Sequence, residues 1–280
     1  MSAISLADVA RNVRDLPSPT LVLEQLLRSF DQVDVSIDEL DGLIARDQAL
    51  AARTLRLANS SFYGLQSAVR TIPQAITVLG FDSVRSLVVS AGVIDCFTPA
   101  AGSSFDYRAF WRHAIGTALA ARALARCCGK SPEFAFVAGL LHDVGVLVLM
   151  TRFGTEYAAA LAHQLETDCP LPEAERAVLE LDHTTVGRVL AQQWKFPGML
   201  QRAIANHHQP MDGDLGDLPA IVHVASCLVH GLDLAGVERE MAVIPLRKPW
   251  DSLRLDAAAL RRVLDDTVSE FDEACQILAA

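Results

Sequence analysis

The stretch Gly139-Leu140-Leu141-His142-Asp143-Val144-Gly145 is the most informative part of the chain, because it places a His-Asp pair inside an apolar run. Burying an imidazole or a carboxylate costs free energy unless a partner satisfies the group. A divalent metal ion satisfies both groups at once. The stretch therefore predicts a metal centre at His142 and Asp143, with a hydrogen-bonded structural pair as the alternative.

The segments around this stretch repeat their apolar residues at the spacing of helices. Residues 106–128 place Trp111 and Ile115 on one face of a long helix. The Ser-Pro-Glu sequence at 131–133 is a typical helix start, and the helix that follows is expected to carry the His-Asp pair. Further helices are expected over residues 157–167, 171–181, 183–194, 197–205, 219–232 and 256–278. No alternation typical of β-strands extends over a useful length, so the sequence predicts an all-α protein.

Cap signals organise the first hundred residues. Ser36 and Glu39 stand at the spacing of a capping box, and Asp47 is expected to cap the next helix. Pro73 is tolerated in the first turn of a helix over 72–79. Residues 98–104 are rich in Pro, Gly, Ser and Ala, a composition typical of a domain boundary.

Composition excludes several classes of protein. The 280 residues are 51% hydrophobic and carry a net charge of -10, whereas a general nucleic-acid binder needs a basic face. The six cysteines form no CxxC pair, which favours reduced thiols in a cytoplasmic protein. Residues 1–11 lack the features of a signal peptide, and the apolar run at 137–150 is too short and too polar to span a bilayer. We therefore expect a cytoplasmic protein with no membrane partner.

Several segments together resemble the HDOD domain, an HD-related output domain of bacterial signalling. In the first half these are Leu16-Pro17-Ser18-Pro19, IARDQAL at 44–50, LRLANSSFYG at 55–64 and AITVLG at 75–80. In the second half they are LLHDVG at 140–145, WKFP at 194–197 and the His207-His208 doublet. The resemblance covers roughly residues 15–235. We expect an HD-like helical bundle over 101–235, preceded by an N-terminal helical part over 1–100 and followed by a helical extension over 236–280.

The order of the histidines along the chain resembles the two-metal HD-GYP phosphodiesterases, which cleave cyclic di-GMP. On that comparison, a first metal would be bound by His113, His142 and Asp143. A second metal would be bound by Asp143, His183, His207 and His208. Imidazole and carboxylate ligands accept iron, manganese, zinc or nickel. In such enzymes the metal polarises the phosphoryl group and lowers the pKa of a bound water.

Three departures from the enzyme pattern argue against catalysis. Ser226 stands where the resemblance implies a late aspartate ligand, and a neutral hydroxyl is a poorer ligand for a hard cation. Val146 replaces a lysine that could hold a phosphate, and no Gly-Tyr-Pro segment follows His183. His223 or Asp233 could replace the missing carboxylate, although no pattern in the sequence requires it.

Each histidine also has a structural interpretation. His113 would be a buried core residue, and His183 would start a helix beside Asp182. The His207-His208 doublet would lie at a helix end, where imidazoles favour the last carbonyl groups. His163 and His230 are interpreted as ordinary surface residues.

Three functions remain open on these grounds. The leading hypothesis is a non-catalytic signal-transduction protein that regulates a signalling partner through protein–protein interaction, with any metal in a structural role. The alternative is a metal-dependent phosphohydrolase that acts on cyclic di-GMP. A second alternative is a sensor that binds a cyclic di-nucleotide or a related nucleotide without turnover.

Overall fold

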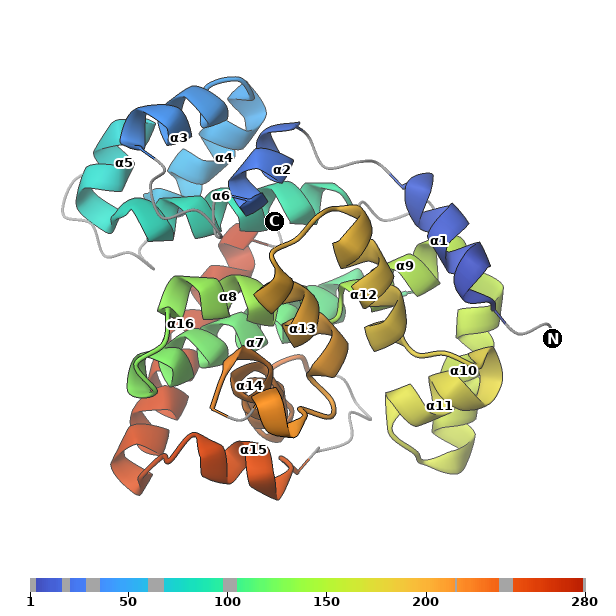
Figure 1. The fold of residues 1–280 in the computed structure, drawn as a ribbon. Coiled ribbons are helices and arrows are strands. Elements are labelled where there is room, and N and C mark those ends of the chain that lie inside the picture. The colour runs from blue at the N-terminus through green and yellow to red at the C-terminus, as the bar shows by residue number, and fades with distance from the viewer. Residues whose placement is uncertain are drawn as a thin grey trace.

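A computed structural model describes residues 4–16, 21–28, 36–59, 68–97, 105–214, 216–236 and 244–278. Its elements in chain order are α1 (Leu6–Arg14), α2 (Leu21–Arg28), α3 (Ile37–Ile44), α4 (Gln48–Ala58), α5 (Ile72–Leu79), α6 (Phe81–Asp95), α7 (Tyr107–Cys127), α8 (Pro132–Leu141), α9 (Val144–Arg152), α10 (Gly154–Thr167), α11 (Leu171–Leu179), α12 (His183–Gln193), α13 (Gly198–Asn206), η3 (Asp212–Asp214), α14 (Leu218–Gly231), α15 (Arg247–Ser252) and α16 (Ala257–Leu278). Every regular element in these ranges is a helix, so the all-α prediction is confirmed. Helices α2–α6 form one group at the top of Figure 1, above the larger group that contains α7–α15.

Local caps define the ends of the N-terminal helices. The Ser36 hydroxyl accepts a hydrogen bond from the Glu39 amide, and the Glu39 carboxylate accepts one from the Ser36 amide, which confirms the predicted capping box of α3. Asp47 caps α4 by accepting from the Leu50 amide. Helix α5 has the predicted bounds, with Thr71 as its cap. Helix α6 packs against α2, α4 and α5 and so holds this group together.

Three features of the sequence lie outside the described residues. They are residues 17–19 of the Leu-Pro-Ser-Pro segment, residues 60–64 of the LRLANSSFYG segment, and the expected domain boundary at 98–104. The division of the chain at residues 100 and 235 therefore stays a prediction.

Helix α7 is the centre of the larger group, and α8, α14 and α16 all pack against it. Its buried face is rich in alanine, which lets neighbouring helices approach closely. A β-carbon at Gly139 of α8 would lie only 2.7 Å from the Cα atom of Ala118. The long C-terminal helix α16 is fixed to α7 by an ion pair between Arg122 and Glu270. This arrangement buries the two helices, α7 and α8, that lead into the His-Asp pair.

The His-Asp pair does not lie within one helix, so that expectation is wrong. Helix α8 ends at Leu141 and α9 begins at Val144, and the pair forms the turn between them. The turn brings Gly145 against the start of α12, where an added β-carbon would lie 1.9 Å from the carbonyl oxygen of His183. Only a residue without a side chain fits there, so the close approach of α9 to α12 requires glycine at position 145.

Two helices were not expected from the sequence. Helix α1 is capped by Ser5 and packs on α12, well apart from α2–α5 in Figure 1. Helix α15 is a short element that packs on α14. Helix α1 thus lies against the helix that begins at His183, and α15 lies against the helix that carries Ser226.

By length and composition, one segment of the described residues, Pro132–Arg152, could cross a membrane. However, 78% of its apolar window is buried inside the fold, as is typical of a core helix in a globular protein. The apolar character of α8 and α9 is thus accounted for by their place in the helical core.

Candidate metal centre

The structure brings all six sequence-predicted residues together around the carboxylate of Asp143. His113 comes from α7, His142 and Asp143 from the α8–α9 turn, His183 from the start of α12, and His207 and His208 from the end of α13. The Oδ2 atom of Asp143 is 3.1 Å from Nε2 of His142 and 3.9 Å from Nε2 of His113. Its Oδ1 atom is 3.3 Å from Nε2 of His183 and 3.2 Å from Nε2 of His207. Asp143 thus lies between two groups of imidazoles.

These residues form two half-sites that share Asp143. The first half-site consists of His113, His142 and Asp143. The second half-site consists of Asp143, His183, His207 and His208. Within each half-site the donor atoms lie within 4.8 Å of one another, and the Nε2 atoms of His183 and His208 are 3.0 Å apart. Ligands that bind one ion at about 2.0–2.2 Å are separated by about 3–3.5 Å, so the second half-site has the dimensions of a coordination sphere.

Hydrogen bonds to the backbone determine which nitrogen of two rings carries the proton. The Nδ1 atom of His142 lies 2.7 Å from the carbonyl oxygen of Gly139, and that of His207 lies 2.9 Å from the carbonyl oxygen of Ile204. A carbonyl oxygen only accepts, so Nδ1 must be the donor in both rings. In the neutral rings the Nε2 lone pairs therefore point at the Asp143 carboxylate.

This arrangement leaves buried acceptors without donors. Nε2 of His142, Nε2 of His207 and Oδ1 of Asp143 are buried and make no hydrogen bond. Burial lowers the pKa of His207 to about 4, so its ring is neutral near pH 7 and Nε2 does not donate. Burial also lowers the pKa of His208 well below its ordinary value. Lone pairs that face a carboxylate repel it, and a cation between them would remove the repulsion.

A buried glutamate holds His183 in place. Glu175 is fully buried on α11, and its Oε2 atom accepts from the His183 amide at 2.8 Å and from Nδ1 of His183 at 2.7 Å. Burial alone would lower the pKa of His183, but Glu175 and Asp143 outweigh it and raise that pKa well above its ordinary value. A carboxylate behind a ligating imidazole orients the ring and increases its basicity. Nε2 of His183 is thereby directed at Asp143.

The sequence interpretation missed Glu175, although one signal was present. Pro172, Glu175 and Leu179 follow the i, i+3, i+7 spacing of a helix face, and all three are buried. A carboxylate on the apolar face of a helix is unusual, because a buried charge requires a partner. Its partner, His183, is eight residues away and meets it only through the turn between α11 and α12.

The first half-site is less complete than the second. Oγ of Ser226 lies 3.3 Å from Nε2 of His113, at the place of the missing carboxylate, and Oγ1 of Thr117 lies 3.5 Å from the same nitrogen. Val146, at the position of the expected lysine, is aliphatic and buried in the core, so it offers no charge to a phosphate. Two hydroxyls therefore contact the His113 nitrogen that would otherwise face a metal.

Neither proposed replacement for the carboxylate joins the cluster. Both ring nitrogens of His223 make hydrogen bonds to the backbone, to the carbonyl oxygen of His207 at 2.7 Å and to the amide of Leu246 at 2.9 Å. Asp233 follows α14 on the exposed surface. Among the residues that the structure describes, the ligand set of the first half-site therefore consists of His113, His142 and Asp143.

The interpretation of His230 as an ordinary surface residue is wrong. Its ring stacks on His113, with the ring centroids 4.3 Å apart and the planes inclined by 35°. His230 lies one helical turn beyond Ser226 on α14, so the same face of that helix brings both residues to the cluster. The sequence contained a signal for this position of His230. Ser226 was expected at the site, and a residue four positions later on a helix lies on the same face.

Comparison with known proteins agrees with this architecture. The family model of the HDOD domain matches residues 16–210. The chain belongs to the HDOD domain family. An HDOD domain protein of unknown function from Geobacter sulfurreducens is 26% identical, with a TM-score of 0.75, over 99% of this chain and 98% of its own. A Shewanella amazonensis SB2B protein named "Putative phosphohydrolase" is 25% identical, with a TM-score of 0.77, over 96% of this chain and 97% of its own.

A curated relative of this HDOD chain comes from Treponema pallidum (strain Nichols) and is described as an uncharacterized protein. It is 26% identical over 208 residues, which are 74% of this chain. The match covers 39% of the relative, so the HDOD chain spans about two fifths of its length.

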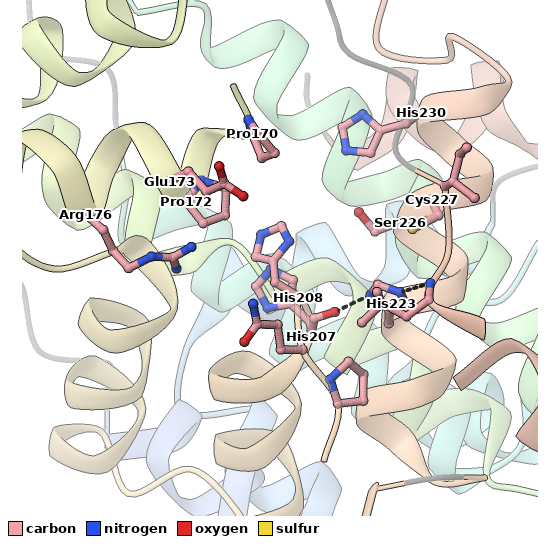
Figure 2. A pocket seen from close by; sticks show the side chains of 14 residues that line it. Pro170, Pro172, Glu173, Arg176, His207, His208, His223, Ser226, Cys227 and His230 are labelled. Carbon is pink, nitrogen blue, oxygen red and sulfur yellow. Dashed lines mark hydrogen bonds between the residues drawn. The ribbon is translucent and has the colours of Figure 1, made fainter. Parts of the chain in front are cut away.

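A pocket of about 520 Å³ opens beside the second half-site of the HDOD chain. Figure 2 shows His207 and His208 between two walls, with Glu173 and Arg176 on one side and the α14 residues Ser226, Cys227 and His230 on the other. The rest of the lining is largely apolar and consists of Pro170, Pro172, Pro210, Ile244 and Leu246, together with Gln209 and His223. A pocket of this size and character is typical of a small-molecule site.

The charges at this pocket are nearly balanced. The guanidinium group of Arg176 forms an ion pair with Asp182, and the carboxylate of Glu173 is exposed one turn away on α11. Among the described residues that line the pocket, Arg176 is the one guanidinium or ammonium group. The pocket therefore offers an incoming phosphate little net positive charge from side chains.

The donor set of the HDOD cluster fits a first-row divalent transition metal. Three imidazoles and one carboxylate in the second half-site are ligands of iron, manganese, zinc or nickel. Fixed ring orientations and buried acceptors without donors are the features that a metal ion would satisfy. Such an ion, when bound, acts as a Lewis acid toward an oxygen ligand.

Proposed function

We propose that this HDOD protein is a metal-binding regulatory module that contacts a signalling protein partner and does not hydrolyse phosphoesters. The single observation that carries the proposal is the inequality of the two half-sites. The second half-site has four donors and oriented rings, whereas Ser226 occupies the carboxylate position of the first. One metal ion in the second half-site would tie α9, α12 and α13 together, since Asp143, His183 and His207 lie at their ends.

The residues of the centre would act by holding helices rather than by reacting. Asp143 bridges the α8–α9 turn to α12 and α13, and Glu175 connects α11 to the same point through His183. Loss of the ion would leave lone pairs facing the Asp143 carboxylate in a buried site, which weakens the contacts among these helices. The faces that these helices present to a partner would then change with metal occupancy. We place the protein in the cytoplasm, because all six cysteines are free thiols.

Metal analysis of the purified protein by emission spectroscopy tests this proposal directly. We expect about one equivalent of bound metal per chain, and none in Asp143→Asn, which lacks the bridging charge. Asp265→Asn is the matched control, because Asp265 is exposed on α16 away from the cluster. Two equivalents in the wild-type chain, or equal loss of metal in both variants, would contradict the proposal.

A second candidate function is a metal-dependent phosphodiesterase, and the pocket beside His207 and His208 favours it. The name of the Shewanella amazonensis SB2B structure supports the same candidate. The two functions separate in an assay of cyclic di-GMP and bis(p-nitrophenyl) phosphate with added manganese or iron. Turnover that disappears in Asp143→Asn would establish the phosphodiesterase and refute the non-catalytic proposal. Calorimetric binding of cyclic di-GMP without turnover would instead identify a nucleotide sensor.

A further inference from the structure

His223 connects two parts of the molecule that are distant in the sequence. Its ring lies on α14 and is only 4% exposed. Nδ1 donates to the carbonyl oxygen of His207, and Nε2 accepts from the amide of Leu246 (Figure 2). A carbonyl group only accepts and an amide only donates, so the two bonds require the neutral ring with its proton on Nδ1. His223 thus makes one defined bridge with no spare nitrogen.

The two ends of this bridge have different roles. His207 is a residue of the second half-site, and its own ring is oriented by the carbonyl oxygen of Ile204. Leu246 belongs to the rim of the pocket, where its side chain and that of Ile244 are exposed. Leu246 is also the N-terminal cap residue of α15. The bridge therefore runs from the metal centre to the rim through one buried ring.

We infer that His223 is a positioning residue that couples the pocket rim to the metal centre. The inference rests on the proposed metal site. His207 can direct Nε2 at Asp143 only while its backbone is held, and His223 holds the carbonyl group of that backbone. Displacement of Leu246 leaves a buried acceptor on His223 without a donor, which favours movement of the ring.

The coupling gives the pocket a regulatory role. A molecule that enters the pocket contacts the rim at Ile244 and Leu246 and the half-site at His207 and His208, because all four residues line it. Coupling between two sites is reciprocal, so metal binding must also stabilise the rim. Exchange of the Leu246 amide hydrogen reports on the rim directly, since that hydrogen is bonded to His223.

Hydrogen exchange with and without manganese or zinc tests the coupling in the wild-type chain. We expect the metal to slow exchange of the Leu246 amide by on the order of fivefold or more. His223→Leu removes both bonds at similar volume, so the amide should exchange rapidly and no longer respond to metal. His223→Gln should restore the response, because its amide group donates to His207 and its oxygen accepts from Leu246.

Release of the metal to a chelator provides a second readout. We expect His223→Leu to lose metal at least fivefold faster than the wild type, and His223→Gln to lose it at nearly the wild-type rate. If the wild type binds metal but exchange at Leu246 is unchanged, the coupling is overturned and the metal centre stands. If the wild type takes up no metal, both are overturned. The wild-type measurement decides the matter even if His223→Leu does not fold.

Discussion

Gly145 and His183 lie so close that a β-carbon on the glycine would be 1.9 Å from the carbonyl oxygen of the histidine. The contact joins the start of α9 to the start of α12 and so sets the position of two residues of the metal centre. Gly145→Ala should therefore destabilise the fold by about 2 kcal/mol or more, because backbone must move to admit the methyl group. Urea denaturation measures the change. Gly42→Ala is the control, since a β-carbon there meets no atom within 4 Å and should raise helix stability by about 0.5–1 kcal/mol.

Glu175 should be as important to metal affinity as a direct ligand. Glu175→Gln removes the negative charge beside His183 but keeps an oxygen that can accept its hydrogen bonds, so the ring loses the added basicity that the carboxylate gives it. We expect metal affinity to fall by about 10–100-fold, measured by competition with a chelator. Glu173→Gln on the same helix should leave affinity within about twofold, because Glu173 is exposed and is not part of either half-site. Equal effects of the two substitutions would show that charge on α11, rather than contact with His183, matters.

Much of the fold could be predicted because its signals are local. The capping box at Ser36 and Glu39 acts within one turn, and the bounds of α5 follow from Thr71 and Gly80. The break between α8 and α9 had no such signal. Directly after it, Gly145 meets the backbone of His183, 38 residues later, and no local pattern contains that contact.

The candidate site likewise has residues that the sequence could predict and residues that it could not. The residues with reactive side chains could be predicted, and the structure groups all of them around Asp143. The residues that orient them could not, because a glutamate such as Glu175 has no distinctive chemistry until its partner is known. His230 was misplaced for a related reason. Its contact with His113 depends on how α14 lies against α7, and the sequence does not determine that packing.

The ion pair between Arg122 and Glu270 should contribute to stability far more than a surface pair does. The Arg122 side chain is 4% exposed, and its guanidinium also lies over the ring of Phe136. Glu270→Ala would remove the carboxylate that pairs with this buried guanidinium, so we expect a loss of about 3 kcal/mol in urea denaturation. Asp8→Ala, which breaks an exposed pair with Arg11, should have a much smaller effect. A small loss of stability in Glu270→Ala would mean that water reaches Arg122 where the partly exposed Glu270 side chain had been.

The cysteines should differ strongly in reactivity toward iodoacetamide. Burial raises the pKa of Cys227 to about 12 and that of Cys275 to about 11, so near pH 8 their thiolate fractions are very small. Cys127 is exposed and should be alkylated first. Peptide mapping after a timed reaction measures the order. The two slow thiols should react faster as the pH rises toward 10, because the thiolate fraction grows with pH. Early modification of Cys227 would show that the pocket wall on α14 opens in solution.

Ser226→Asp should convert the incomplete half-site into a metal-binding one. The serine hydroxyl lies 3.3 Å from Nε2 of His113, so a carboxylate there would stand beside His113, His142 and Asp143. The first half-site now has two neutral imidazoles and a carboxylate that it shares with the second half-site. A second carboxylate would supply the negative charge that a second divalent ion needs. We expect bound metal to rise from about one to about two equivalents per chain. Ser226→Asn has the same shape without the charge and should remain at one. If Ser226→Asp also remains at one, the limit lies in the hydrogen bonding of His113 by Thr117 rather than in the missing carboxylate.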